Sequence, residues 1–243
     1  MTAPLFFLPG WCLGRGPLNA AVDALHGTIL DLPGYRGAPL VTAFDAAADG
    51  VAARLPPGAT LAGWSIGAQL ALAVAARHPA KVGRLVLVAG TASFVQRDGW
   101  PHAMPPAMLA EFAAGIAADA EAMLPRFVGG FNRGDARAKD VTRALLDLAD
   151  PPPPAAVLAA GLDWLRDIDL RPAAPNVAAP TLLIHGAADP LMPPAAAAAL
   201  AALIPGSRLA IFDGCAHAPF ISRPDDFLAT VRNFLNDERS DVP

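Results

Sequence analysis

The stretch "LAGWSIGAQLALAV", residues 61–74, changes character at one serine. Before Ser65 the residues have the continuous apolar pattern of a buried strand, and after it they form an alanine-rich run typical of a helix. Glycines at 63 and 67 flank the serine. A tight turn that needs small residues would explain them. So would the motif G-x-S-x-G, in which a strained strand-to-helix turn lifts a serine hydroxyl above a sheet.

Composition narrows the class of protein. The chain has 243 residues, of which 54% are hydrophobic and 16% charged, so it can bury a large core and is not generally disordered. A formal charge of −4 argues against nucleic-acid binding. No apolar run reaches the roughly 18 residues of a membrane span, and the first residues lack the basic region of a signal peptide. We therefore expect a cytoplasmic protein without a membrane segment or a nucleic-acid partner.

Cysteine usage gives no sign of a metal site. The two cysteines are too few for a disulfide framework, and neither C-x-x-C nor a Cys/His cluster occurs. We expect no metal and no cofactor.

Six short apolar runs are each followed by a turn marked by Gly, Pro or Asp. Most are apolar throughout, as expected of parallel strands that are buried on both faces. Helical stretches separate them, and this alternation predicts an α/β fold with a mostly parallel, doubly wound sheet of about six strands. The predicted strands lie at 4–10, 28–34, 60–64, 84–90, 181–186 and 208–214. The predicted helices lie at about 17–26, 44–55, 66–78, 194–204 and 224–237.

One segment interrupts this alternation. Between Gly90 and Thr181 there is no convincing strand, whereas residues 106–124, 137–149 and 155–168 look helical. We interpret about 95–172, called the inserted segment below, as a helical lid within a single domain of residues 1–243. It would lie above the carboxyl ends of the strands, where α/β sheets place their sites. The alternative is an independent second domain, which the renewed strand pattern after Thr181 disfavours.

The serine requires a base, because a hydroxyl is a weak nucleophile until its proton is taken. His217, in "DGCAHAPF", follows the last predicted strand and so lies at the same edge of the sheet as Ser65. We predict that it is the base. The other four histidines lie near helix ends, at the start of the inserted segment or beneath the site: His26, His78, His102 and His185.

A carboxylate must then orient the histidine and stabilise its cation. Asp189, in "TLLIHGAADPLMP", follows the penultimate strand and gives the chain order Ser…Asp…His. Asp213 competes, but its place at a strand end suits holding the loop, and Asp31 would order its own turn. We therefore predict a catalytic triad of Ser65, His217 and Asp189.

Two backbone N–H groups should face the developing oxyanion. One is expected from Ile66, which follows the nucleophile, and the other from Trp11 in the loop "LPGWCLGRG". Gly10 would let that backbone approach closely. Phosphate binding is the alternative for this loop, but G-x-G-x-x-G and G-x-x-x-x-G-K-[ST] are both absent.

Several stretches across almost the whole chain are similar to one family. They are "GWCLG", "LDLPGY", "GWSIGA", "RDGWP" (97–101), "GLDWLRDIDLR" (161–171), "NVAAPTLLIHGAADPLMP" and "CAHAPFISRP". The first three are common to the α/β-hydrolase superfamily, and the fourth, fifth and "HAPFISRP" are more specific. On these motifs the chain resembles the pimeloyl-acyl-carrier-protein methyl ester carboxylesterases of biotin synthesis.

That resemblance implies the same triad and oxyanion residues, and hydrolysis of a methyl ester on a carrier-bound pimeloyl chain. It places Phe127 and Phe131 in the acyl pocket, with Trp11, Ile66 and His217 also touching substrate. There are departures. Pro9 stands where the family usually has histidine, and Phe131 where it has glutamine. The family's opening hairpin is missing, so we expect a six-stranded sheet with a barer edge and somewhat lower stability.

The resemblance also implies an acyl carrier protein as partner. Between residues 126 and 143 the chain has five positive and two negative side chains. Arg126, Lys139 and Arg143 match the family's basic contact positions. A solvated helix face is the alternative.

Two other functions stay open at this point. One is a broad-specificity short-chain esterase or lactonase, and the other is a non-catalytic binding protein with a hydrolase fold. Cys12 adjoins the predicted oxyanion residue and Cys215 lies two residues before His217. We predict that at least one of these thiols lies close enough to the site for a bulky adduct to block it. The alternative is that both are small buried hydrophobes.

Overall fold

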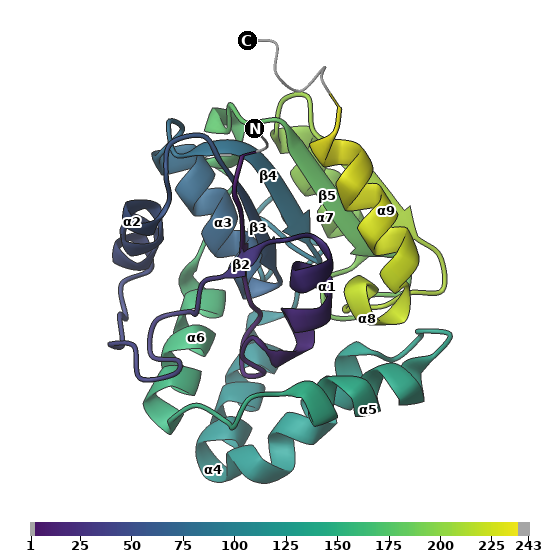
Figure 1. Cartoon of the computed structure of the whole chain (residues 1–243). Coiled ribbons are helices and arrows are strands. Elements are labelled where there is room, and N and C mark those ends of the chain that lie inside the picture. Colours follow the sequence, from purple (N-terminus) through teal and green to yellow (C-terminus); the bar gives the residue numbers. More distant parts are fainter. Residues whose placement is uncertain (1–2, 238–243) are drawn as a thin grey trace.

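The computed structural model describes residues 3–237, and its six strands form one parallel sheet in the order β2-β1-β3-β4-β5-β6 (Figure 1). The register aligns the carboxyl ends of the central strands, since Trp64 pairs with Val88 and Val88 with Ile184. The predicted α/β fold with six parallel strands is confirmed. The strands are β1 Leu5–Leu8, β2 Thr28–Ile29, β3 Ala59–Trp64, β4 Val82–Val88, β5 Thr181–Gly186 and β6 Arg208–Phe212.

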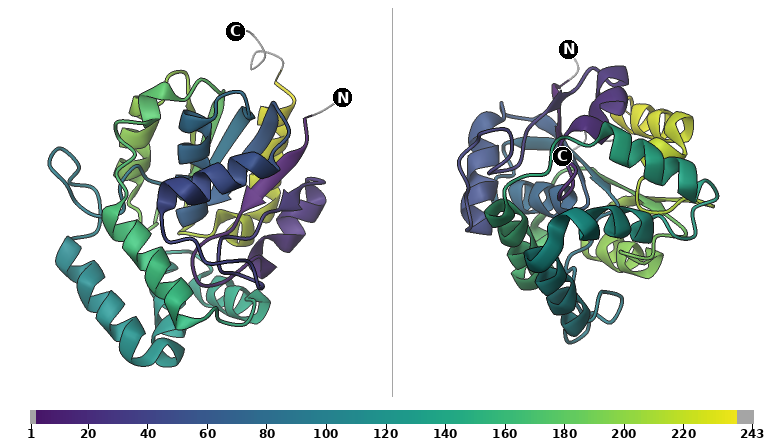
Figure 2. Two further views of the ribbon diagram at one scale, coloured as in Figure 1. Left: turned by 90° about the vertical axis from the view of Figure 1, so that its left-hand side faces the viewer. Right: turned by 90° about the horizontal axis from the view of Figure 1, so that it is seen from below.

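Helices cover both faces of this sheet (Figure 2). On one face α1 packs against α9, and on the other α2 packs against α3. The helices are α1 Asn19–Ala24, α2 Phe44–Arg54, α3 Ile66–Arg77, α4 Pro106–Phe131, α5 Ala138–Leu148, α6 Ala155–Asp167, α7 Pro194–Leu203, α8 Pro219–Ser222 and α9 Pro224–Leu235. The described residues also form two 3-10 helices, η1 Gly16–Leu18 and η2 Ala174–Asn176.

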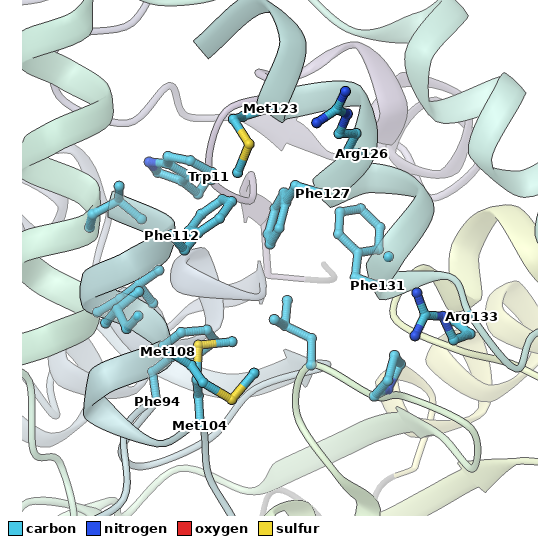
Figure 3. A pocket seen from close by; sticks show the side chains of 16 residues that line it. Trp11, Phe94, Met104, Met108, Phe112, Met123, Arg126, Phe127, Phe131 and Arg133 are labelled. Atoms are coloured by element: carbon cyan, nitrogen blue, oxygen red, sulfur yellow. The ribbon is translucent and has the colours of Figure 1, made fainter. Parts of the chain in front are cut away.

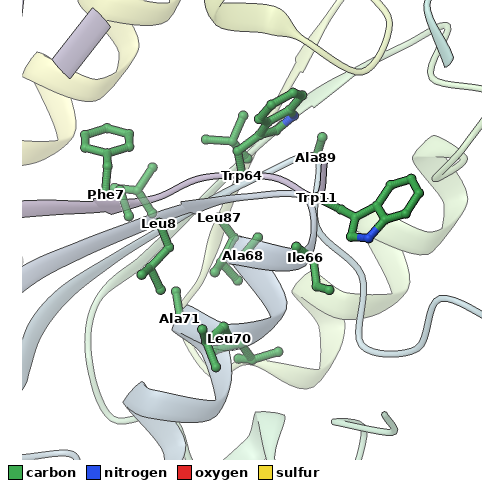
Figure 4. Close-up of a cluster of buried hydrophobic side chains, with 14 of the residues drawn as sticks. Phe7, Leu8, Trp11, Trp64, Ile66, Ala68, Leu70, Ala71, Leu87 and Ala89 are labelled. Atoms are coloured by element: carbon green, nitrogen blue, oxygen red, sulfur yellow. The ribbon is translucent and has the colours of Figure 1, made fainter. Parts of the chain in front are cut away.

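The centre of the sheet is the centre of the core. Every residue of β3 and β5 is buried, which explains why these strands are apolar throughout rather than alternating. Helix α3 is buried from Ile66 to Ala75, and its alanines let the helix lie close to β3 and β4 (Figure 4). The edge strands β2 and β6 are half-buried or exposed.

Three elements differ from the sequence prediction. Helix α4 continues to Phe131 instead of ending at 124. It is kinked at Asp119, whose carboxylate accepts the Ala122 N–H at 3.0 Å and so caps a second helical stretch that tolerates Pro125 inside it. The short helix α8 was not predicted, because it lies among loop-like residues after His217. Strand β2 has only two residues, although the Leu30 N–H still donates to the Phe7 carbonyl oxygen of β1 at 2.9 Å, and the chain turns at residues 33–34.

The inserted segment contains α4, α5 and α6, which gather at the carboxyl end of the sheet (Figure 1). The strands that flank it in sequence, β4 and β5, are neighbours in the sheet. The chain therefore leaves the sheet after β4 and returns beside it. That the segment acts as a lid stays a prediction.

Candidate active site

Ser65 lies at a sharp turn between β3 and α3. Its backbone has φ 59° and ψ −121°, a region that non-glycine residues rarely adopt. The two flanking glycines are needed because a Cβ at Gly63 would lie 2.1 Å from the Gly67 carbonyl oxygen. A Cβ at Gly67 would lie 2.4 Å from the carbonyl oxygens of Leu8 and Pro9. The turn therefore packs directly against the loop after β1.

Three side chains that are distant in sequence meet at this turn. The His217 Nε2 lies 3.0 Å from the Ser65 Oγ, and its Nδ1 lies 2.7 Å from the Asp189 Oδ2. All three residues are at least nine-tenths buried. The serine comes from the carboxyl end of β3, and the other two come from the loops after β5 and β6. This geometry lets His217 take the serine proton while Asp189 holds the imidazole.

The loop after β5 fixes the Asp189 carboxylate. Its Oδ1 accepts the N–H groups of Leu191 and Met192, both at 2.9 Å, which leaves Oδ2 for the histidine. His185 packs beneath it, as expected, and its Nε2 lies 2.6 Å from the Met192 carbonyl oxygen. Burial lowers the pKa of His185, so its ring is neutral at pH 7. The Asp189 Oδ2 therefore lies near two imidazoles, at 3.5 Å from the neutral ring of His185 and at 2.7 Å from that of His217.

The other candidate histidines lie away from Ser65. His26 and His102 are exposed. His78 lies 2.7 Å from the Asp49 carboxylate at the far end of α3. None of the three has a hydrogen bond to the serine within the described residues.

The two competing carboxylates also have other positions. Asp31 accepts a hydrogen bond from the Arg15 guanidinium at 2.9 Å. Asp213 is exposed just after β6, and its backbone carbonyl accepts a bond from Arg223. The structure thus brings Asp189, and neither of these, to the imidazole.

The predicted oxyanion donors lie next to the sharp turn at Ser65, called the elbow below. Ile66 is the first residue of α3, so its N–H has no acceptor within the helix. Trp11 belongs to the loop after β1, the strand that pairs with β3 so that Leu8 lies opposite Gly63. The Trp11 indole donates to the Leu158 carbonyl at 3.1 Å, which ties this loop to α6. The oxyanion role of both N–H groups stays a prediction.

An apolar pocket of about 370 Å³ lies between the inserted segment and the sheet (Figure 3). Phe127 and Phe131, which the resemblance placed in an acyl pocket, both line it. Sequence reasoning assigned no pocket role to the other lining residues, although Leu162, Leu165, Pro190 and Leu191 lie in the family-like stretches. These residues are Phe94, Met104, Met108, Leu109, Phe112, Met123, Gly130, Arg133, Leu162, Leu165, Pro190 and Leu191. Trp11 and Arg126 complete the wall.

The serine opens into a smaller space. A cavity of about 20 Å³, large enough for one water, is lined by Ser65 and His217. It shares six lining residues with the apolar pocket, so the two spaces are adjacent. Four of these six shared residues are aromatic. Phe131 lies 5.0 Å from the His217 ring and 5.1 Å from Phe127, centroid to centroid.

The predicted docking cations do not form one cluster around the pocket. Arg126 lines it, together with Arg133. Lys139 and Arg143 lie four residues apart on α5, where both are exposed. Their role in docking stays a prediction.

Both cysteines are buried and reduced. Burial raises the pKa of both thiols, that of Cys215 to about 12. Cys12 has a φ of 65°, and its N–H donates to the Tyr35 hydroxyl at 3.0 Å. Both are therefore neutral thiols in loops next to site residues.

Neither a metal cluster nor a membrane helix is found in the described part of the chain. Across residues 3–237, no three His, Cys, Asp or Glu side chains gather in a way that could hold a metal ion. No helix in the same range combines the length and apolar character that crossing a membrane requires.

Comparison with known proteins identifies the family and the fold. A model described as "Alpha/beta hydrolase family" matches residues 5–230. A protein of Aromatoleum aromaticum named pimeloyl-[acyl-carrier protein] methyl ester esterase is 41% identical, over 95% of this chain and 97% of that protein. A protein of the same name from Nitrosomonas europaea is 36% identical, over 93% and 92%. The solved esterase of Exiguobacterium antarcticum superposes with a TM-score of 0.83 at 23% identity, over 98% and 94% of the two chains.

Proposed function

The chain belongs to the alpha/beta hydrolase family, and from this premise we propose that it hydrolyses the methyl ester of a pimeloyl chain carried by acyl carrier protein, a step of biotin synthesis. The observation that carries the proposal is the hydrogen-bonded series Ser65, His217 and Asp189 beside an apolar pocket. The names of the relatives that are 36–41% identical over most of the chain supply the substrate.

Acylation begins when the Ser65 Oγ attacks the ester carbonyl carbon and His217 Nε2 takes the hydroxyl proton. The carbonyl oxygen becomes an oxyanion, which the N–H groups of Trp11 and Ile66 stabilise. As the intermediate collapses, His217 returns the proton to the departing methoxide, and methanol leaves. Asp189 stabilises the imidazolium throughout. The product is pimeloyl-Ser65, with the carrier still attached at the far end of the chain.

Deacylation repeats these steps with water. His217 takes a proton from the water as its oxygen attacks the acyl carbon, and then returns that proton to the Ser65 Oγ. A free carboxylate remains on the carrier-bound chain.

The pocket suits the middle of this substrate. A pimeloyl chain presents a run of methylenes between the ester and the thioester, and the lining is almost entirely aromatic and aliphatic. Burying methylenes stabilises binding by about 0.8 kcal/mol each. Arg126 and Arg133 are the two cations of the lining, and they suit the phosphate of the carrier's prosthetic arm. We propose an acyl carrier protein as the partner, in keeping with the names of the relatives, and the cytoplasm as the compartment in which the two meet.

The test compares two substrates on one enzyme preparation. The methyl ester of pimeloyl-carrier should be hydrolysed with a kcat/KM well above that of p-nitrophenyl esters of two to eight carbons. Equal kcat/KM values would favour a broad-specificity short-chain esterase or lactonase. No reaction of Ser65 with a fluorophosphonate would favour a non-catalytic binding protein and overturn the proposal.

A further inference from the structure

A short stretch of the inserted segment crosses to the loop that carries His217. Residues 134–137, between α4 and α5, lie beside the loop before α8 (Figure 1). The Ala136 N–H donates to the Gly214 carbonyl oxygen at 2.9 Å. The Arg137 guanidinium donates to the Ser222 carbonyl oxygen at 3.3 Å, beyond the histidine. The two segments are thus tied on both sides of His217.

The central contact is a buried carboxylate. Asp135 is 7% exposed, and its Oδ2 accepts the Ala216 N–H at 2.9 Å. Its Oδ1 accepts the Arg137 N–H at 2.7 Å. The bond to Arg137 closes a local turn, because donor and acceptor are two residues apart, and it uses only one carboxylate oxygen. The first spans 81 residues of sequence and serves the histidine loop.

The position of that bond gives it a function. Ala216 directly precedes His217, and the His217 carbonyl oxygen accepts a bond from the Trp64 indole at 2.9 Å. The backbone is therefore held on both sides of the histidine, by Asp135 before it and by Trp64 at it. A bond from N–H to an ionised carboxylate is about twice as strong as a neutral one. The side chain of His217 has its own partner in Asp189.

We propose that Asp135 is a positioning residue for His217, which couples the seating of the inserted segment to the alignment of the base. The inference rests on the proposed triad. If residues 134–137 move away from the loop that carries His217, Ala216 loses its acceptor and His217 can drift from Ser65. Misplacing a catalytic group by about 1 Å can lower a rate about 100-fold.

Two substitutions and one control test this. Asp135→Ala removes both acceptors, and Asp135→Asn keeps one oxygen at the same volume. We expect kcat to fall about 10-fold to 100-fold in Asp135→Ala and less in Asp135→Asn, with KM nearly unchanged for a p-nitrophenyl ester. Asp140→Asn is the control, because Asp140 is an exposed carboxylate in the first turn of α5. Its kcat should equal that of the wild type.

A second readout separates positioning from folding. The downfield proton resonance of His217 Nδ1–H should shift or broaden in Asp135→Asn and stay in place in Asp140→Asn. Wild-type kcat together with an unchanged resonance in Asp135→Asn would overturn the inference. This outcome can be read even if Asp135→Ala fails to fold. The rate of fluorophosphonate labelling of the wild type reports the proposed triad separately. A wild type that labels, with Asp135 variants that label equally fast, removes only the role of Asp135.

Discussion

The indole Nε1–H of Trp64 donates a hydrogen bond to the backbone carbonyl of His217 at 2.9 Å. Trp64 is the residue before the nucleophile, and its ring also packs edge-on against Phe220, 4.9 Å away between centroids. One buried side chain therefore links the strand that carries the serine to the loop that carries the base. Gly10 completes the arrangement, since a Cβ there would lie 2.8 Å from the Trp64 ring.

Replacing Trp64 with Phe should lower kcat about 10-fold, because the His217 carbonyl is left buried without its donor. An unsatisfied buried group costs about 1–3 kcal/mol, some of which the loop can relieve by moving the imidazole. Steady-state kinetics with a p-nitrophenyl ester measure the effect, and circular dichroism checks the fold. An unchanged kcat would show that Asp189 alone suffices to place the base.

The triad should respond in a graded way. Ser65→Ala should remove nearly all hydrolysis while leaving the fold intact, because only a hydroxyl is lost. His217→Ala should be similarly severe, and Asp189→Asn should be damaging through loss of orientation and charge. Each loss should be on the order of 10³ or more in kcat.

Asp213→Asn is the matched control for the acid, because Asp213 is an exposed carboxylate four residues before the histidine. It should keep wild-type kcat. A large loss of kcat in Asp213→Asn, together with a small loss in Asp189→Asn, would reverse our assignment of the acid.

The sheet and the elbow are predictable from sequence for a local reason. Parallel strands buried on both faces are apolar throughout, and the conformation of Ser65 demands small neighbours, so both leave marks on adjacent residues. Asp135 leaves no such mark, since its partner Ala216 is 81 residues away and contributes only a backbone N–H. The same holds for most of the apolar pocket, whose residues come from loops and helices that meet only in the folded chain.

The end of α4 shows a different limit. A proline inside a helix removes one backbone hydrogen bond, so Pro125 reads as a helix end. The kink at Asp119 starts a new capped helical stretch before Pro125. The burial of Val128 and Phe131 then stabilises the helix beyond the proline. Local propensity is overridden by burial in this case.

Gly161→Ala should damage catalysis through Trp11. A Cβ at Gly161 would lie 2.4 Å from the Trp11 Cδ1, so the indole and the loop that bears the Trp11 N–H must shift. Losing the alignment of one oxyanion donor lowers kcat about 100-fold to 1,000-fold, and a partial shift should cost about 10-fold or more. Gly129→Ala in α4 is the control, because the nearest atom to the added Cβ, the Thr142 Cγ2 of α5, would be 3.9 Å away. It should keep kcat and stabilise the fold by about 0.5–1 kcal/mol. Equal kcat in both variants would show that Trp11 has room to move.

Both cysteines should react slowly in the folded protein. Burial raises the pKa of Cys215 to about 12, and that of Cys12 also rises, so the reactive thiolate is scarce below that pH. At pH 8 the thiolate of Cys215 should be about a thousand-fold rarer than that of a free cysteine. An aromatic disulfide reagent should therefore modify both thiols quickly in denaturant and only slowly in the native protein. The rate of modification of the native protein should rise with pH. Forced modification should block hydrolysis, because Cys215 is two residues from His217. Full modification with unchanged activity would contradict the predicted closeness to the site.

Reversing the charges of Lys139 and Arg143 should weaken only the carrier-bound substrate. The two side chains are exposed one turn apart on α5, away from the triad, where they can attract an acidic carrier. Charges at the rim of an interface mainly raise the association rate, and salt screens them. The double variant Lys139→Glu, Arg143→Glu should therefore raise KM for pimeloyl-carrier methyl ester at low salt. The difference in KM from the wild type should shrink as the salt concentration rises. Hydrolysis of a small p-nitrophenyl ester should be unchanged. Arg54→Glu in α2 is the control for a reversed exposed charge elsewhere, and it should affect neither substrate. Equal losses on both substrates would indicate that α5 has lost its packing, and no effect on either would make these charges an ordinary solvated face.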